Sequence, residues 1–185
     1  PAAPPPNPCL EYVRPHASFS ACPDLGHADL RNSSLRGADL NYVDLRGTTL
    51  DGSDLRDATM IAASCGAASF RGAQLRKADL NLADLRRARF ESADMREVSF
   101  TGAALGGADF TSADLRLSKL TMIRAARGVT FDFAKIDGTT LTDSDFPASS
   151  FKHTSLENAA FEDVQLDGST FVNAKLDGLR FIDSS

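Results

Sequence analysis

Residues 73–95 read AQLRK ADLNL ADLRR ARFES ADM, in which a leucine, phenylalanine or methionine returns at every fifth position. The same step continues outward in both directions, so that an apolar residue stands at each of twenty consecutive centres from Leu25 to Leu120. A small or β-branched residue, most often alanine, precedes nearly every centre by two positions. The repeating unit is therefore Ala-Asp-Leu-x-x.

A five-residue period excludes both regular secondary structures. Five residues advance about 500° around an α-helix, which would spread the centres over the whole cylinder. In a β-strand, five is odd, so successive centres would point to opposite faces. The chain must turn once in every unit. We expect a short extended segment with the centre and the small residue pointing inward, then a corner, with each coil hydrogen-bonded to the next.

From Leu25 to Phe181 these units resemble the pentapeptide-repeat proteins. The resemblance implies an all-β fold, a right-handed quadrilateral β-helix with four units in each coil. An independent feature supports four units, because five arginines that directly follow a centre stand twenty residues apart. About 32 units then form about eight coils, a rod about 38 Å long at the spacing of β-strands. The arginines are Arg36, Arg56, Arg76, Arg96 and Arg116.

The register slips once along the chain. After Leu120 the next clear centre is Phe131, a gap of eleven residues instead of ten. We predict one continuous domain, with a first part of the β-helix at 25–120, an irregular unit with a one-residue bulge at 121–130, and a second part at 131–185. One added residue keeps a column of phenylalanines in phase. Its members are Phe70, Phe90, Phe110, Phe131, Phe151 and Phe171.

The residues before the first unit divide into a Pro-rich linker, 1–8, and a predicted N-terminal cap, 9–24. Cys9 and Cys22 bracket the cap and are the plausible disulfide pair, which would stabilise it by roughly 3 kcal/mol. Cys65 stands at a centre and should be buried. Four apolar residues of the cap are expected to cover the first coil. They are Leu10, Tyr12, Val13 and Phe19.

The cysteine pair, the Pro-rich start and the missing initiator Met favour export to the periplasm, the cell exterior or another oxidising compartment. This layout is also similar to exported bacterial members of the family, in which a cysteine pair precedes the first Ala-Asp-Leu unit. The alternative is a cytoplasmic protein with two reduced thiols. The longest uncharged stretch, from Ala58 to Phe70, is too short to span a bilayer, so no membrane insertion is expected.

No pattern in the sequence indicates catalysis. His16, His27 and His153 lie far apart and have no partner at a metal-binding spacing, so we interpret them as surface residues. No phosphate-binding loop or nucleophile motif is present. Aspartates that precede a centre, such as Asp29 and Asp79, are interpreted as corner residues that bind local amides. We predict no catalytic residue, metal or cofactor, and no enzymatic activity.

The arginine column allows two interpretations. Nearby carboxylates can make it an ion-pair ladder that serves solubility and edge protection. Alternatively it is a ridge for an anionic partner, centred on Arg36 and Arg76, whose neighbours in sequence carry no carboxylate. The column turns acidic after the slip, at Asp137, Glu157 and Asp177.

A second outward column is apolar, and the irregular unit adds further candidates for partner contact. Such exposed apolar residues either have no function or mark self-association. The column holds Tyr42, Ala62, Leu82, Gly102 and Met122, beside Ile61. The irregular unit supplies Met122, Arg124 and Arg127, with Phe133 nearby.

Two functional classes follow. The first is an exported, non-catalytic scaffold or protein-interaction module that binds another protein or an anionic surface, or forms an end-to-end or face-to-face homodimer. The second, implied by the resemblance, is a cytoplasmic DNA mimic that binds a type II topoisomerase (DNA gyrase). A mimic needs a strongly negative rod. Residues 1–120 carry 14 basic and 15 acidic groups and residues 121–185 carry 6 and 10, which favours the scaffold without direct nucleic-acid binding.

Overall fold

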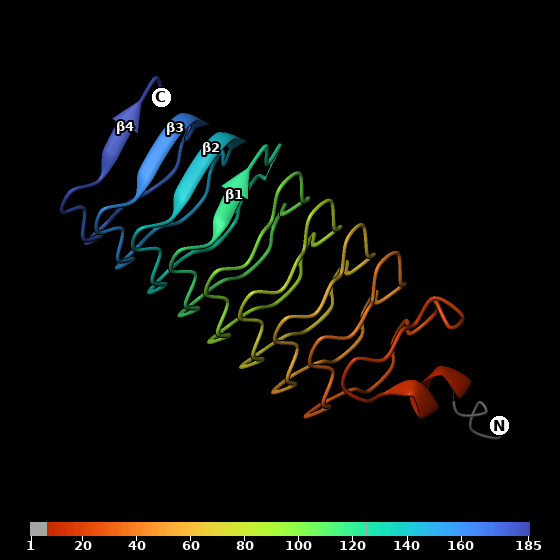
Figure 1. Ribbon diagram of the computed structural model, residues 1–185. Helices are drawn as coiled ribbons and strands as arrows, with labels where there is room; N and C mark the ends of the chain where they lie inside the picture. The colour runs from red at the N-terminus through yellow and green to blue at the C-terminus, as the bar shows by residue number, and fades with distance from the viewer. Residues whose placement is uncertain (1–6, 125) are drawn as a thin grey trace, which may run out of the picture.

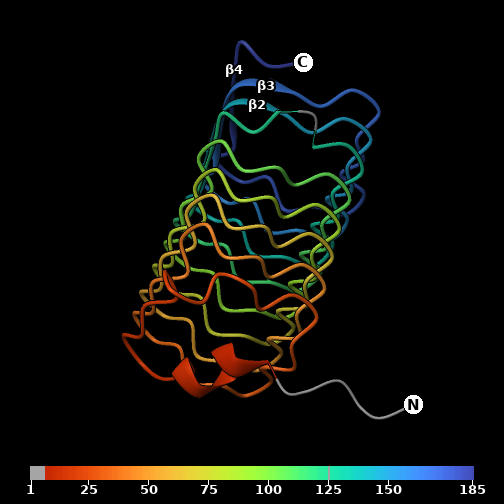
Figure 2. The same cartoon turned by 90° about the vertical axis from the view of Figure 1, so that its right-hand side faces the viewer.

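The computed structural model describes residues 7–124 and 126–185, which form a four-sided β-helix (Figure 1). Residues 1–6 of the expected linker lie outside the described residues. Successive coils stack along one rod, and the two described ends lie at its opposite ends (Figure 2). Parallel bridges join each residue before a centre to the residue twenty positions later, as in Asp39, Thr59 and Asp79. The predicted all-β architecture and its four-unit coil are confirmed.

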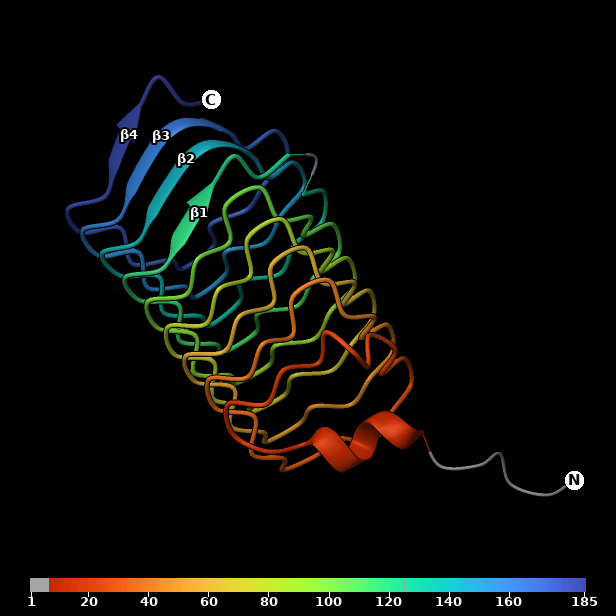
Figure 3. The ribbon, with the colours of Figure 1, turned by 45° about the vertical axis from the view of Figure 1, so that its right-hand side comes forward.

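Regular elements are few because each side of a coil is only three residues long. A 3-10 helix, η1, covers Pro8–Tyr12. Four strands form one parallel sheet in the order β1-β2-β3-β4 on one side of the rod near its C-terminal end (Figure 3). They are β1 at Lys119–Thr121, β2 at Thr140–Asp145, β3 at Ala160–Gln165 and β4 at Arg180–Ile182. Within the described residues no helix is long and apolar enough to cross a membrane.

The interior is filled by the repeat centres. All twenty centres from Leu25 to Leu120 are at most 2% exposed. Alanine two positions earlier keeps the tube narrow, and where serine or threonine stands there its hydroxyl donates to a backbone carbonyl, as from Thr48 to Leu25 at 2.7 Å. One inner column has eight members, in agreement with the predicted number of coils. They are Leu35, Leu55, Leu75, Met95, Leu115, Ile136, Leu156 and Leu176.

The phenylalanine column is confirmed as a continuous stack. Ring centroids of Phe70 and Phe90 are 4.9 Å apart, and those of Phe110 and Phe131 are 5.2 Å apart across the slip. The rings of Phe151 and Phe171 continue the stack at 4.7 Å. The spacing between coils therefore sets the spacing between rings.

The bulge lies where the sequence predicted it. The pairing of Thr121 with Thr142 spans 21 residues, and Ile123 still accepts from the amide of Asp145 in that register. Ala126 donates to the carbonyl of Asp145, which is the ordinary twenty-residue register. The extra residue is therefore taken up between Ile123 and Ala126, and the coil phase is unchanged beyond it.

The N-terminal boundary differs from the expected one. Ser18 bridges Asp39 at a separation of 21, whereas Asp24 bridges Asp44 at 20. Phe19 is fully buried and acts as a repeat centre, with one extra residue before Leu25. The coil thus begins inside the segment 9–24 that was assigned to the cap, because the extra residue hides Phe19 from the five-residue count.

The cap itself is small. Cys9 and Cys22 form a disulfide with their Cα atoms 5.4 Å apart, and Cys9 is buried. The Asn7 side chain accepts from the amide of Cys9 and donates to the carbonyl of Asp24 at 2.8 Å. Leu10 and Tyr12 are 37% and 43% exposed, so they do not cover the first coil as expected. They belong to η1, which turns them toward solvent.

The C-terminal coil has no corresponding cover among the described residues. Its centres Leu176 and Phe181 are 44% and 50% exposed, although the same columns are buried one coil earlier at Leu156 and Phe161. Because each coil buries its centres against its neighbours, this coil contributes less to stability than the inner ones.

This gradient predicts a difference between two identical substitutions. Replacing Phe110 by alanine removes a ring that is stacked on both sides, and should destabilise the rod by about 3–5 kcal/mol. Replacing Phe171, which is partly exposed, should cost clearly less. Thermal melting followed by circular dichroism compares the two variants. Equal losses would contradict the nearest-neighbour account.

The cysteines give a second prediction. Burial raises the pKa of the Cys65 thiol, so that in the folded protein it should not react with an alkylating reagent at mildly alkaline pH. Denatured, unreduced protein made under oxidising conditions should show one reactive thiol, and reduction should raise this to three. Mass spectrometry counts the labels. Three thiols before reduction would exclude the disulfide.

Candidate functional site

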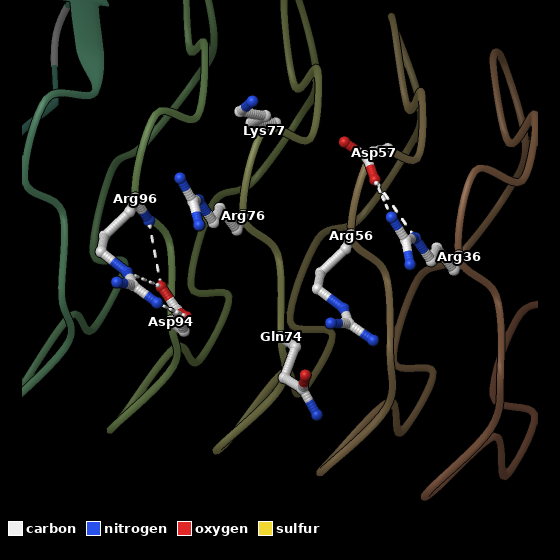
Figure 4. A pocket seen from close by; sticks show the side chains of 8 residues that line it. All are labelled: Arg36, Arg56, Asp57, Gln74, Arg76, Lys77, Asp94 and Arg96. Atoms are coloured by element: carbon white, nitrogen blue, oxygen red, sulfur yellow. Dashed lines mark hydrogen bonds and ion pairs between the residues drawn. The ribbon is translucent and has the colours of Figure 1, made fainter.

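The five arginines of the column lie on successive coils, and we call them the arginine row. The corner after each one is hydrogen-bonded to the next, since Gly37 donates to the carbonyl of Arg56 and Lys77 to that of Arg96. In Figure 4 four of the side chains leave adjacent coils and turn to two different sides. The row contains Arg36, Arg56, Arg76, Arg96 and Arg116.

Three arginines of the row bind the aspartate that precedes the centre of their own unit. Arg96 donates from Nε to Oδ1 of Asp94 at 2.7 Å and from Nη2 to Oδ2 at 2.6 Å. Arg56 with Asp54 and Arg116 with Asp114 repeat this bidentate pairing. The same aspartates also accept from the backbone amide of the arginine, so each carboxylate closes its own corner.

The other two arginines find their partners in the next coil. Arg36 lies 3.2 Å from Asp57, and Arg76 lies 2.6 Å from Glu97. The ridge interpretation took Arg36 and Arg76 as incompletely neutralised, because their neighbours in sequence carry no carboxylate. That interpretation was wrong, because partners 21 residues away in sequence are neighbours across one coil.

The pairing lowers the pKa values of the carboxyl groups. Hydrogen bonds from Arg56 and Arg96 are the largest cause for Asp54 and Asp94. For Asp114, burial acts in the opposite direction, and the hydrogen bonds from Arg116 outweigh it. The arginine side chains are 39–52% exposed, so water screens each pair and its contribution to stability is small.

At two positions before a centre, Ser34 and Gln74, the ladder has no carboxylate. Gln74 occupies the position that Asp54 and Asp94 fill in the coils on either side, and it bridges both through its backbone. Here the surface opens into a groove of about 330 Å³. Figure 4 shows Gln74 on one side of the groove and Lys77 on the other. The lining groups are Arg36, Arg56, Asp57, Gln74, Arg76, Lys77, Asp94 and Arg96.

Cations outnumber acids in the lining of the groove, which holds five cations and two carboxylates, Asp57 and Asp94. Three acids outside the lining, Asp54, Glu97 and Asp114, pair with its arginines. Glu97 also serves two cations, because Lys77 Nζ lies 3.8 Å from its second oxygen. The sequence offered a signal for this groove, because Gln74, like Ser34, lacks the carboxylate that Asp54, Asp94 and Asp114 supply at the same position of the repeat.

The apolar column is exposed as predicted but is not a continuous patch. Tyr42, Leu82 and Met122 are 75%, 63% and 49% exposed, and each is two coils from the next. All three have a backbone φ near +60°, a conformation that favours glycine. Gly102 leaves room for Leu82, whose Cδ2 would lie 2.8 Å from an added Cβ. Whether this column binds a partner stays a prediction.

The residues of the irregular unit do not gather into one site. Met122, Arg127 and Phe133 follow three different centres and so stand on different corners of the coil. Arg124 lies 3.8 Å from Asp145. Phe133 stacks on His153 with ring centroids 4.8 Å apart.

The histidines and the corner aspartates lie where the sequence placed them. His16, His27 and His153 are exposed. Asp29 and Asp79 accept from the amide two residues later at 3.2 and 3.0 Å. In residues 7–124 and 126–185, no three histidine, cysteine or acidic side chains are grouped so that they could hold a metal ion.

Comparison with known families identifies the repeat that builds this rod. The model of the pentapeptide repeats matches eight copies, at residues 24–57, 63–102, 93–122 and 144–181, which together exceed half of the chain. The chain belongs to the pentapeptide-repeat family. Its coils therefore form the right-handed quadrilateral β-helix of that family.

One solved structure shares this fold, and others match with lower TM-scores. QnrB1, a plasmid-mediated fluoroquinolone resistance protein, matches with a TM-score of 0.69 and 14% identity over 90% of this chain and 89% of that chain. HetL, involved in heterocyst differentiation regulation in the cyanobacterium Nostoc, shows 24% identity over 90% and 87%, with a TM-score of 0.31. A thylakoid lumen protein of Arabidopsis thaliana shows 26% identity over 69% and 72%, with a TM-score of 0.38. A search of curated proteins finds no significant match.

The ladder predicts a pH dependence of stability. The folded-state pKa values of Asp54, Asp94 and Asp114 lie below the unfolded value, so their contribution is present at neutral pH and lost as pH falls through the folded values. Melting temperatures measured from pH 7 down to about pH 2 should fall less steeply when all three become asparagine, which still accepts the corner amide. Identical slopes would show that the pairs contribute nothing.

Proposed function

We propose that this chain is a non-catalytic β-helical scaffold that presents its outer faces to another protein or an anionic surface in an oxidising compartment. The packed interior supports this proposal, because the centres from Leu25 to Leu120 leave no space for a substrate inside the rod. Every group able to contact another molecule therefore belongs to the outside. The Cys9–Cys22 disulfide supports the compartment, since such bonds are rare in reducing cytosol.

The groove at Gln74 is the observation that best supports contact with an anionic partner. In the coils on either side, an aspartate of the chain itself receives the arginine. At Gln74 the carboxylate is missing, and Arg76 turns away to Glu97, which Lys77 also approaches. A carboxylate from another molecule can take the missing place, where charge-assisted hydrogen bonds to exposed guanidinium groups are available.

The alternative, a cytoplasmic DNA mimic bound by DNA gyrase, has less support. A surface that imitates DNA must be negative along its length, whereas here a row of five arginines runs along one side of the rod. The likeness to QnrB1 at 14% identity concerns the fold alone. The cations that line the groove at Gln74 favour a partner that is itself acidic.

The test replaces the missing carboxylate. A Gln74→Asp variant should form the bidentate pair with Arg76 that its neighbours form, and should weaken binding of poly-glutamate about threefold or more while the fold is kept. The matched control is Ala104→Asp, which adds the same charge at the same position of the repeat, two units round the coil. Titration by fluorescence anisotropy at low and high salt measures the affinities.

The native chain and the Ala104→Asp control should bind alike, and binding should weaken as salt screens the groove. The double substitution Arg36→Glu, Arg76→Glu should abolish binding. If Gln74→Asp binds as well as the native chain, or if no variant binds at all, the groove is not the contact.

A further inference from the structure

The face that carries the arginine row reverses its charge along the rod. The centres behind this face form the inner column from Leu35 to Leu176. We call the residues directly before these centres the leading row, and those directly after them the following row. The following row is basic up to Arg116 and acidic from Asp137 onward. The leading row does the opposite, with Asp54, Asp94 and Asp114 in the first part and Lys135 and Lys175 in the second. Both rows change sign between the coil of Leu115 and the coil of Ile136.

The two halves of this face also differ in pairing. In the first half all five arginines are engaged in ion pairs with carboxylates of the chain. In the second half no ion pair forms within the described residues at Lys135, Lys175 or any of the three acids. The acids are Asp137, Glu157 and Asp177. The charges of this half therefore have no ion-pair partner in the described part of their own chain, although Asp137 accepts hydrogen bonds from the Ser155 hydroxyl and the Glu157 amide.

We propose that this face binds a second copy of the same chain in an antiparallel homodimer. A two-fold axis that runs across the face, between the coils of Leu115 and Ile136, reverses the order of the coils but keeps each row opposite the same row. Arg116 then lies opposite Asp137 of the second copy, and Asp114 opposite its Lys135. One coil further out, Arg96 lies opposite Glu157. In this register every pair of the following row joins opposite charges. In the leading row only Asp114 and Lys135 do so, since Asp94 lies opposite Ser155 and Gln74 opposite Lys175.

Exposed apolar side chains stand on both edges of the face, on the two coils that flank the axis. Leu117 follows the centre Leu115 and is 63% exposed, and Phe133 precedes the centre Ile136 and is 57% exposed. In the proposed dimer each lies close to the axis and meets its own counterpart. Their contact removes apolar surface from water at the middle of an otherwise polar interface, as in other interfaces with an apolar core and a polar rim.

This inference rests on the proposed function and names its partner, since the acidic half of a second copy is an anionic surface that fits the arginine row. Six coils overlap, a length of about 29 Å at the spacing of β-strands. The face is narrow, so the dimer is weak and depends on concentration and salt. Arg36 and Arg56 extend beyond the second copy. Poly-glutamate and the second copy compete for Arg76 and Arg96.

The first experiment reverses one charge. Sedimentation equilibrium should show a dimer for the native chain, and Glu157→Arg should raise its dissociation constant about tenfold or more, because two symmetric contacts become repulsive. Glu157 has no ion pair within the described chain, so this change should not unfold the protein. The control Asp167→Arg makes the same change at the same position of the repeat on another face. The double variant Arg96→Glu, Glu157→Arg should recover the dimer.

The second experiment tests the register. Leu117→Cys should give a covalent dimer on mild oxidation, because the two thiols meet at the axis. Leu82→Cys is the matched control, since Leu82 is also a corner residue with 63% exposure and a positive φ but lies on a different corner. It should remain monomeric on a non-reducing gel.

This interface is overturned if the native chain stays monomeric, or if Glu157→Arg leaves the dimer intact. It is also overturned if the addition of Arg96→Glu does not restore the dimer. A parallel dimer places Glu157 opposite Ser155, so that the double variant would not be rescued. The proposed function is judged separately on the monomeric Glu157→Arg variant, which keeps the groove at Gln74. Binding of poly-glutamate by that variant supports the anionic contact even when the native chain forms no dimer.

Discussion

The backbone hydrogen bonds between successive coils are the interaction on which the rest of this structure depends. The amide of Leu80 donates to the carbonyl of Ser99, and the amide of Asp79 to that of Ala58, in a pattern that repeats along the rod. These bonds hold each coil about 4.8 Å from the next. Because every coil has four units, residues twenty apart become neighbours, and a property of one position in the repeat becomes a property of a whole row.

Stacking has opposite consequences inside and outside the rod. Inside, identical side chains benefit from it, as the phenylalanine rings show with centroids 4.7–5.2 Å apart. Outside, identical charges repel, so a row of arginines needs acids beside it. The chain supplies these acids in two ways. Asp94 stands before the centre of the same unit as Arg96, whereas Glu97 lies in the coil after that of Arg76. At Gln74, between Asp54 and Asp94, the first way is missing, and the groove lies there.

The same geometry explains why binding belongs to the faces and ends of the rod. The interior is filled by buried repeat centres, and hydroxyl groups there, such as those of Thr48 and Thr154, donate to backbone carbonyls. Each face consists of parallel rows of side chains, and within a row the residue type differs only from one coil to the next. The reversal of charge between Arg116 and Asp137 is therefore a feature of an entire face, and a rigid, flat face can match a second copy without rearrangement.

By itself the sequence determined the period, the identity of the buried centres, the phenylalanine column and the position of the slip, because a five-residue step is a local property that can be counted. It also indicated the pairing of Cys9 with Cys22. It missed Phe19 as a centre, since one extra residue breaks the count. Only the tertiary structure decided which carboxylate each arginine binds, as Arg36 with Asp57 and Arg76 with Glu97 show. Those partners are 21 residues apart in the chain, and the stacking of coils brings them within reach.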